Sequence, residues 1–213
     1  MKETKRRPGR PSKDDPFQKE QLLTHALIEF AKHGYEGASL RKMANLSKVD
    51  VALLSYHFGS KLGLWTSVVD YLTERITLQT VPIKNNYRHM KLETACLALV
   101  DNFVDFCFEF PFHMMFVTNE LSHQSERSTY LMNKMLLPTF RQLMPFIKDC
   151  MEAGVIKKQE PALYYLMLVN SVSLLGTIPN FVNEFREDFT VNSDLKGEMK
   201  QAVLANFFQI AVD

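Results

Sequence analysis

The sequence is poor in the residues that interrupt helices. It has 8 glycines and 9 prolines in 213 residues, which is typical of helical proteins and argues against many short strands. No stretch has the sustained alternation of a strand, and no internal repeat is visible. Because 46% of the residues are hydrophobic, the chain can bury a core and global disorder is excluded. These features predict an all-α protein.

Cysteine and long apolar runs are also scarce. The three cysteines, Cys96, Cys107 and Cys150, lie in apolar surroundings without CxxC or Cys/His spacing, as expected of core residues in a reduced, cytoplasmic protein without a bound metal. The charged N-terminus has no apolar run behind it, so we expect no secretory signal. Polar residues interrupt the most apolar window, 162–182, which favours a buried helix over a membrane span.

The motifs of common enzymes are missing as well. The sequence has no Gly-rich phosphate loop, nucleophile elbow, metal-spaced histidine cluster or paired catalytic carboxylates. We therefore expect no enzymatic activity and no cofactor. The remaining classes are proteins that bind other macromolecules.

Charge is small overall, at +1, but unevenly distributed. The first 13 residues hold six basic residues and one acidic residue, whereas residues 62–213 hold 13 basic and 17 acidic residues. We expect residues 1–14 to form a flexible basic arm, either a solubilising tail or a contact for an anionic partner. Arg6, Arg7 and Arg10 surround a Gly-Arg-Pro string similar to an AT-hook, which enters narrow minor grooves; phosphate neutralisation is the simpler interpretation.

Capping residues and helical periodicity predict a series of helices. Asp15 and Pro16 suit a helix start, and Gly34 suits a left-handed stop. A bend is expected at Pro138 or Pro145. The expected helices are 16–33, one capped by Ser39, one capped by Asp50 and ended by Gly59, one from Ser60 toward Pro82, 90–109, one opened by Pro111, 126–153 ended by Gly154, 161–185 and 195–211.

The second and third expected helices have the properties of a helix-turn-helix. Such a unit lays its second helix in the major groove, which requires small residues near that helix's start and no acidic residues on its outer face. Val51 and Ala52 are small, and Ser55, Tyr56 and His57 are polar and able to face outward. The alternative that these residues leave open is an ordinary three-helix bundle.

A family resemblance favours the first interpretation. The segment SLRKMANLSKVDVALLSYHFGSKLGLW, residues 39–65, resembles the DNA-binding signature of the TetR family of bacterial regulators, and the resemblance covers roughly residues 16–65. The residues in register are Ser39, Met43, Ala44, Val49, Leu54, Tyr56, His57, Phe58 and Lys61. Lys48, Asp50 and Ser55 depart from the family's usual glycine, serine and tyrosine, which puts the DNA sequence preference in doubt more than DNA binding.

The resemblance implies a helix-turn-helix DNA-binding domain at 15–61 and a helical ligand-binding and dimerisation domain at 62–213. It implies phosphate contacts for Ser39, Tyr56, His57 and Lys61. It implies that Val51, Ala52 and Tyr56 face base edges. Arg41, Lys42 and Lys48 are further candidates for DNA contacts, and so is Ser55, which lies on the same expected helix as Tyr56.

The C-terminal half offers candidates for a dimer contact and a ligand cavity. The helices expected at 161–185 and 195–211 are too apolar for lone surface helices, and the resemblance implies a four-helix dimer interface. We expect this interface to contain Leu166, Val169, Val172, Leu175, Val203, Phe207 and Phe208. Phenylalanine and methionine in the middle helices suit either a plain core or an adaptable cavity. The cavity candidates are Phe103, Phe106, Cys107, Phe110, Met114, Asn119, Tyr130 and Met135.

The function that the sequence favours is a ligand-responsive DNA-binding transcriptional regulator. The resemblance implies a cytoplasmic homodimer that represses from a palindromic double-stranded operator until a small-molecule effector releases it, without a membrane partner. The alternative is a ligand-independent architectural DNA-binding protein or a helical protein-interaction protein. The effector, the operator and the direction of regulation are not determined by the sequence.

Overall fold

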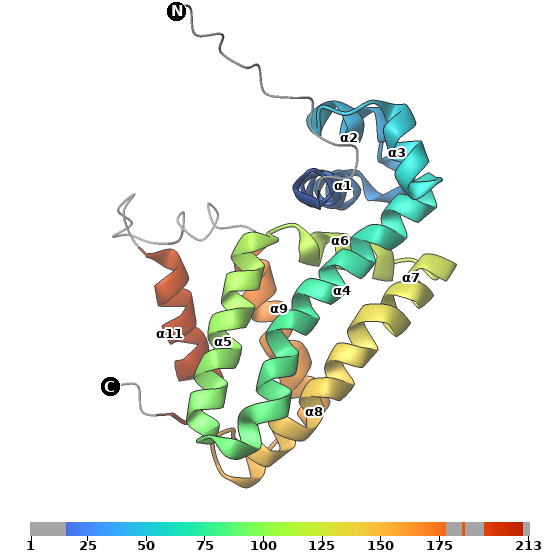
Figure 1. Ribbon diagram of the computed structural model, residues 1–213. Coiled ribbons are helices and arrows are strands. Elements are labelled where there is room, and N and C mark those ends of the chain that lie inside the picture. Colours follow the sequence, from blue (N-terminus) through green and yellow to red (C-terminus); the bar gives the residue numbers. More distant parts are fainter. Residues whose placement is uncertain (1–15, 178–184, 186–193, 211–213) are drawn as a thin grey trace, which may run out of the picture.

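The computed structural model describes residues 16–177, 185 and 194–210, and its regular elements are helices (Figure 1). No strand occurs among the described residues, so the expected all-α fold is confirmed. The arm expected at 1–14 lies outside the described residues. So do residues 178–184 and 211, which we expected to be helical. None of the helices in the described ranges combines the length and the apolar content needed to cross a membrane.

Three helices form the N-terminal end of the protein. Helix α1 spans Pro16–Gly37, α2 spans Leu40–Leu46 and α3 spans Val51–Phe58. The chain turns at Gly34, whose φ of 65° is the left-handed conformation expected there, so the regular part of α1 ends where the sequence predicted. Figure 1 shows these helices grouped at one end, with α3 at the periphery.

Helix α4, Lys61–Asn86, connects this end to the rest of the molecule and packs against α1, α5 and α8. We expected it to end near Pro82, and this expectation was wrong, because the helix continues through Pro82 to Asn86. A proline removes the bond to the carbonyl four residues earlier, here that of Leu78. Leu78 is exposed, so water can satisfy its carbonyl, and the Asn86 amide donates to the Pro82 carbonyl at 2.8 Å.

The remaining helices form a bundle around α4. They are a short 3-10 helix at Tyr87–His89, α5 Leu92–Glu109, α6 His113–Leu121, α7 Glu126–Leu131, α8 Leu137–Glu152, α9 Pro161–Thr177 and α11 Leu195–Phe207. Figure 1 shows α4, α5 and α8 running side by side, with α9 behind them and α11 beside α5. A π-helical turn at Met132–Leu136 joins α7 to α8 just before Pro138, so the expected irregularity falls at the first of the two prolines.

The core is continuous from the N-terminal helices into the bundle. Phe30 of α1 and Trp65 of α4 are fully buried and pack against Phe116 of α6, with ring centroids 6.4 and 5.6 Å away. Cys96, Cys107 and Cys150 are buried and free, as expected. Because the aromatic cluster belongs to both ends, a movement of α6 changes the packing of α1.

Candidate DNA-binding surface and regulatory cavity

The helix-turn-helix is built by the caps that the sequence predicted. Ser39 Oγ accepts the Lys42 amide at the start of α2, and Asp50 Oδ1 accepts the Ala52 amide at 3.0 Å at the start of α3. Lys48 occupies the turn with a φ of 55°, the left-handed conformation that glycine adopts more easily. The departure from glycine therefore keeps the turn and strains its backbone.

The third helix turns one face to the core and the other to solvent. Leu54 is buried, and Val51 packs half-buried against the core. Ala52 and Tyr56 are exposed, and Tyr56 keeps 78% of its surface accessible. Ser39, Arg41, Lys48, Ser55 and His57 are exposed as well. Most of the expected DNA contacts therefore lie on accessible surface, whereas Val51 belongs partly to the core.

Two of the expected contacts are held by partners inside the protein. Lys42 Nζ lies 3.1 Å from the carboxylate of Glu29, a buried residue of α1 whose other oxygen accepts the Ser39 amide at 3.3 Å. Lys61 Nζ donates to the Glu36 carbonyl at 3.0 Å. These lysines brace α1 against α2 and α4, and a phosphate contact by either requires it to leave its present partner. The sequence analysis did not identify Glu29. The feature that could have indicated its role is a carboxylate on an otherwise apolar face of its helix.

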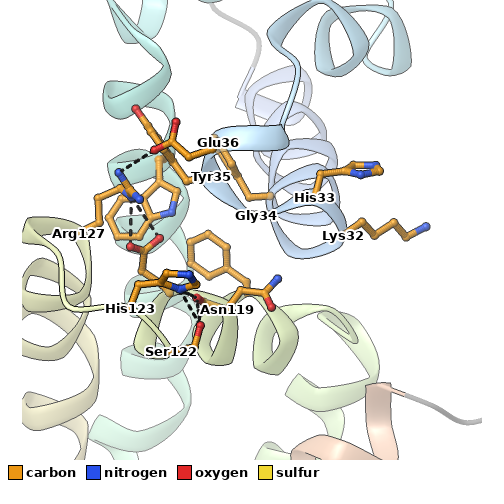
Figure 2. Close-up of a pocket in the computed structure, with 13 residues that line it drawn as sticks. Lys32, His33, Gly34, Tyr35, Glu36, Asn119, Ser122, His123 and Arg127 are labelled. Atoms are coloured by element: carbon orange, nitrogen blue, oxygen red, sulfur yellow. Dashed lines mark hydrogen bonds and ion pairs between the residues drawn. The ribbon is translucent and has the colours of Figure 1, made fainter.

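A polar junction joins α1 to α6 and α7. A pocket of about 460 Å³ lies between the end of α1 and the turn after α6. Figure 2 shows the side chains that line it. The Asn119 amide donates to the Ala31 carbonyl at 2.6 Å. Arg127 reaches across from α7 and stacks 3.8 Å from the centre of the Tyr35 ring.

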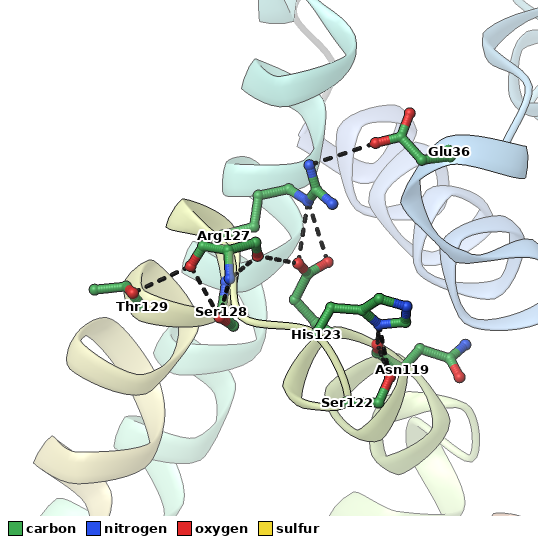
Figure 3. Close-up of polar contacts among 9 residues, drawn as sticks. Glu36, Asn119, Ser122, His123, Arg127, Ser128 and Thr129 are labelled. Atoms are coloured by element: carbon green, nitrogen blue, oxygen red, sulfur yellow. Dashed lines mark hydrogen bonds and ion pairs between the residues drawn. The ribbon is translucent and has the colours of Figure 1, made fainter.

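Arg127 is held by a buried carboxylate. Its Nε lies 3.1 and 3.2 Å from the oxygens of Glu120, which also accepts from the Ser125 hydroxyl at 2.8 Å (Figure 3). Its Nη1 lies 3.7 Å from the carboxylate of Glu36 on α1. The charge of buried Glu120 is thus balanced by a guanidinium that simultaneously contacts α1, so α1, α6 and α7 are tied together.

A second cavity lies inside the bundle. It has a volume of about 120 Å³ and is bordered by α4, α5, α6, the π-helical turn, α8 and α9. Four of the eight cavity residues expected from the sequence line it, namely Phe103, Phe106, Met114 and Met135. We call it the bundle cavity.

The other four expected cavity residues lie elsewhere, so these assignments need correction. Cys107 and Phe110 are buried on another side of α5, where Cys107 lies 3.8 Å from the Ser173 hydroxyl and Phe110 packs edge-on against Tyr71. Asn119 belongs to the junction with α1. The Tyr130 hydroxyl donates to Asp70 at 3.0 Å, beside the Trp65 ring. Composition does not fix which apolar residues of α5 face the cavity, because buried apolar residues lie on more than one side of this helix.

His113 is the buried titratable residue of the bundle cavity. Its Nδ1 lies 2.7 Å from the Phe110 carbonyl, which only accepts, so Nδ1 carries the proton and Nε2 accepts from the Ser173 hydroxyl at 3.0 Å. Burial lowers the pKa of His113 to about 4, because a charged imidazolium loses its hydration. The side chain is therefore neutral at pH 7.

The buried imidazole predicts a pH dependence of stability. An unfolded histidine has a pKa of about 6.5, so between about pH 6.5 and 4 the unfolded chain binds more protons and the free energy of unfolding falls as pH is lowered. We expect a loss on the order of 3 kcal/mol from His113 across this range. Urea unfolding of wild type and His113→Gln from pH 7 to 4 measures it. The variant loses this part of the slope, and the exposed control His89→Gln keeps it; equal slopes for all three proteins would contradict the assignment.

The ninth helix carries an exposed apolar stripe. Leu163, Leu166, Met167, Leu174 and Leu175 lie at helical spacing and are between 37% and 62% exposed. We call these residues the α9 stripe. The opposite face of α9 packs on α5 and α6.

The expected dimer residues divide between these two faces. Leu166 and Leu175 belong to the α9 stripe, whereas Val169 and Phe207 are half-buried. Val172, Val203 and Phe208 are buried within the chain, where α9 and α11 pack on α5 and the Phe208 ring meets Tyr164. Some of the expected residues of α9 and α11 are thus buried within the chain and others are exposed, a distinction that the sequence pattern did not make.

The structure combines a helix-turn-helix, whose third helix faces outward, with a larger helical bundle. Residues 22–68 match the family described as bacterial regulatory proteins, tetR family. This match covers the N-terminal helices and the start of α4, so residues 22–68 resemble the DNA-binding region of a family of regulators. The resemblance noted for residues 39–65 is confirmed.

Individual relatives agree with this assignment. HTH-type transcriptional regulatory protein RaaS of Mycobacterium tuberculosis (strain ATCC 25618 / H37Rv) is 37% identical over 62 residues, which are 29% of either chain. The match thus spans less than a third of the length of RaaS. Among solved structures, HlyIIR, a hemolysin II transcriptional regulator, aligns with a TM-score of 0.61 and 22% identity over 87% of this chain and 96% of its own. AibR, solved in complex with isovaleryl coenzyme A and operator DNA, aligns with a TM-score of 0.68 and 13% identity over 90% and 98%. These two show a shared fold.

Proposed function

We propose that this protein is a cytoplasmic repressor that binds a palindromic operator as a homodimer and leaves it when a small molecule enters the bundle cavity. The observation that carries the proposal is the exposed face of α3, where Ala52 and Tyr56 stand free of the core beside exposed basic residues. In this assignment residues 15–61 bind DNA, and residues 62–213 dimerise and bind the effector. The neighbour AibR supports it, since that protein is described with both operator DNA and isovaleryl coenzyme A.

Reading of the operator follows from the face of α3. Ala52 is small enough to let the first turn approach base edges in the major groove, and Tyr56 and His57 reach base edges or phosphates. Ser39 caps the start of α2, where the helix dipole favours a phosphate. Arg41 and Lys48 are exposed cations for neighbouring phosphates.

Dimerisation is supported by the α9 stripe. A helix-turn-helix protein reads half-sites that are about 34–36 Å apart, which requires two copies at fixed separation. The stripe places five large apolar side chains in solvent on one helix face. A second copy of the same helix, packed by twofold symmetry, would bury both stripes at once.

The response to an effector is supported by helix α6, which reaches both sites. Its first half lines the bundle cavity with His113, Met114 and Val117, and its last turn contacts α1 and α7 through Asn119 and Glu120. A molecule that fits only one position of α6 favours the matching position of α1 and α3. A coupling of about 1–3 kcal/mol changes operator affinity by about 5–150-fold.

The proposal is tested by a footprint on the DNA upstream of the protein's own gene. We expect protection of two half-sites related by a twofold axis and separated by about one helical turn. Binding that is indifferent to sequence would favour the architectural alternative, and the absence of binding at low ionic strength would reject DNA binding altogether.

The basic arm, which lies outside the described residues, adds a salt-dependent contribution. Deleting residues 1–13 is expected to weaken DNA affinity and to flatten the plot of log affinity against log salt by about one unit for each phosphate that the arm neutralises. A variant in which Arg6, Arg7 and Arg10 become lysine keeps the charge and serves as the control. It should retain the slope, and it loses affinity selectively at A·T-rich sites only if the arm enters the minor groove. An unchanged slope after deletion would exclude the arm from the DNA interface.

A further inference from the structure

The bundle cavity is lined without a charged side chain. Its lining contains no Asp, Glu, Lys or Arg among the residues that the structure describes. Its walls are mainly aromatic and aliphatic, and the imidazole of His113 is neutral and bonded at both nitrogens. An ion placed in this cavity would find no partner of opposite charge.

Most neutral polar groups on the walls are already bonded within the protein. The Thr80 hydroxyl donates to the Ile76 carbonyl and accepts from the Gln142 amide, and the Thr139 hydroxyl donates to the Met135 carbonyl at 2.7 Å. The Asn102 amide donates to the Gln79 carbonyl at 3.2 Å. These bonds leave two neutral side chains on the walls for a polar molecule, the carboxamide of half-buried Gln79 and the hydroxyl of Tyr165.

Tyr165 carries the second of these two groups. Its hydroxyl forms no hydrogen bond to any described residue, although burial of the residue raises the pKa of the phenol to about 12. The phenol is therefore protonated at neutral pH and can donate one hydrogen bond or accept one. It offers a neutral anchor for a single hydroxyl, carbonyl or amide group.

The volume limits the size of the occupant. Apolar cavities of about 150 Å³ stay dry and take up benzene, and the bundle cavity has a volume of about 120 Å³. Met114 and Met135 border it, and methionine side chains change rotamer easily. The cavity can therefore take one ring or a short branched chain with a small adjustment of these two residues.

We propose that the effector of this regulator is an uncharged, largely apolar molecule of about the size of one aromatic ring, carrying at most one or two neutral hydrogen-bonding groups. This inference rests on the proposed function, because it assigns the bundle cavity as the effector site. Discrimination against ions follows from desolvation. A carboxylate or ammonium group that enters the cavity loses its hydration and gains no counter-charge.

The experiment compares molecules of one shape and different charge. Toluene, benzyl alcohol, benzoate and benzylammonium are titrated into the full-length protein without DNA at pH 7.5, and dissociation constants are measured by calorimetry. We expect toluene and benzyl alcohol to bind, and benzoate and benzylammonium to bind at least about 100-fold more weakly. A Tyr165→Phe variant should weaken benzyl alcohol and leave toluene unchanged, because only the alcohol can use the phenol.

Two further variants locate the binding. Leu143→Phe fills space from α8 and should weaken both neutral molecules by at least about 10-fold, since the added ring occupies the same volume. Gln79→Arg, at a half-buried position on α4, places a cation on the wall and should improve benzoate binding without improving toluene. Thermal unfolding of each variant identifies a protein that fails to fold. If Leu143→Phe fails to fold, the Gln79→Arg result decides alone, because Gln79 is half-buried whereas Leu143 is buried.

Two results would overturn the inference. One is benzoate or benzylammonium binding as tightly as benzyl alcohol, and the other is the absence of binding by both neutral molecules at millimolar concentration. Neither depends on DNA, so failure here is distinguishable from failure of the repressor assignment. If the protein protects an operator and a charged molecule releases it, the proposed function stands and the effector class is rejected. If the neutral molecules bind the protein but no operator is found, the cavity assignment stands and the repressor function is rejected.

Discussion

Replacing Ala52 with glutamate is expected to lower operator affinity by about 100-fold or more while leaving the fold intact. Ala52 is exposed in the first turn of α3, so in the proposed complex a carboxylate there faces base edges and phosphates. Each unfavourable interaction of this kind costs about 1–3 kcal/mol, and a dimer presents the change twice. A carboxylate at a helix start is favourable to the helix itself, so unfolding of the variant is not expected.

The measurement is fluorescence anisotropy with the footprinted operator at fixed salt, together with thermal unfolding. Leu78→Glu is the matched control, because Leu78 is 62% exposed on α4 and lies far along the chain from the third helix. It adds the same charge and should leave operator affinity within about twofold, as distant surface charges are screened. Equal affinities for wild type and Ala52→Glu would remove α3 from the DNA interface.

Replacing Met167 with arginine is expected to convert the proposed dimer into a monomer. Met167 is 62% exposed near the middle of the α9 stripe, and in a twofold interface its partner would be another copy of the same stripe. Burying two arginines without counter-charges costs several kcal/mol, which raises the dissociation constant of the dimer by at least about 100-fold. Operator affinity is expected to fall as well, because a monomer binds one half-site and loses the avidity of two linked DNA-binding domains.

Sedimentation equilibrium of wild type, Met167→Arg and Leu97→Arg at micromolar concentration tests this. Leu97 is, like Met167, an exposed apolar residue, but it lies on α5 outside the α9 stripe. Its variant should therefore remain dimeric. A wild-type protein that sediments as a monomer would reject the proposed interface. A Met167→Arg protein that stays dimeric would place the interface on another face.

Several local features were predictable because neighbouring residues determine them. Ser39, Asp50 and Ser60 cap their helices through their own side chains, and Gly34 and Gly59 adopt the positive φ expected at helix ends. Lys48 keeps the turn in the same conformation without glycine. These interactions span a few residues, so the order of side chains along the chain contains the information.

Contacts between distant segments were not predictable in the same way. Pro82 stays inside α4 because the bundle supports the helix on both sides of it. The partners of Lys42 and Lys61 come from α1, and Arg127 binds a carboxylate and a ring that are adjacent only after folding. The sequence identified Lys42 and Lys61 as available charges without their partners, and it gave no indication for Arg127.

The sequence by itself determined the helical class, the helix-turn-helix and the outward row of α3, since caps and periodicity are local and the family signature is continuous. Only the tertiary structure decided which phenylalanines border a cavity, which apolar residues of α9 remain exposed, and that α6 joins the cavity to α1. The physical reason is that apolar residues surround several of these helices, and their rotation is set by the summed packing of all neighbours rather than by any pattern within one helix.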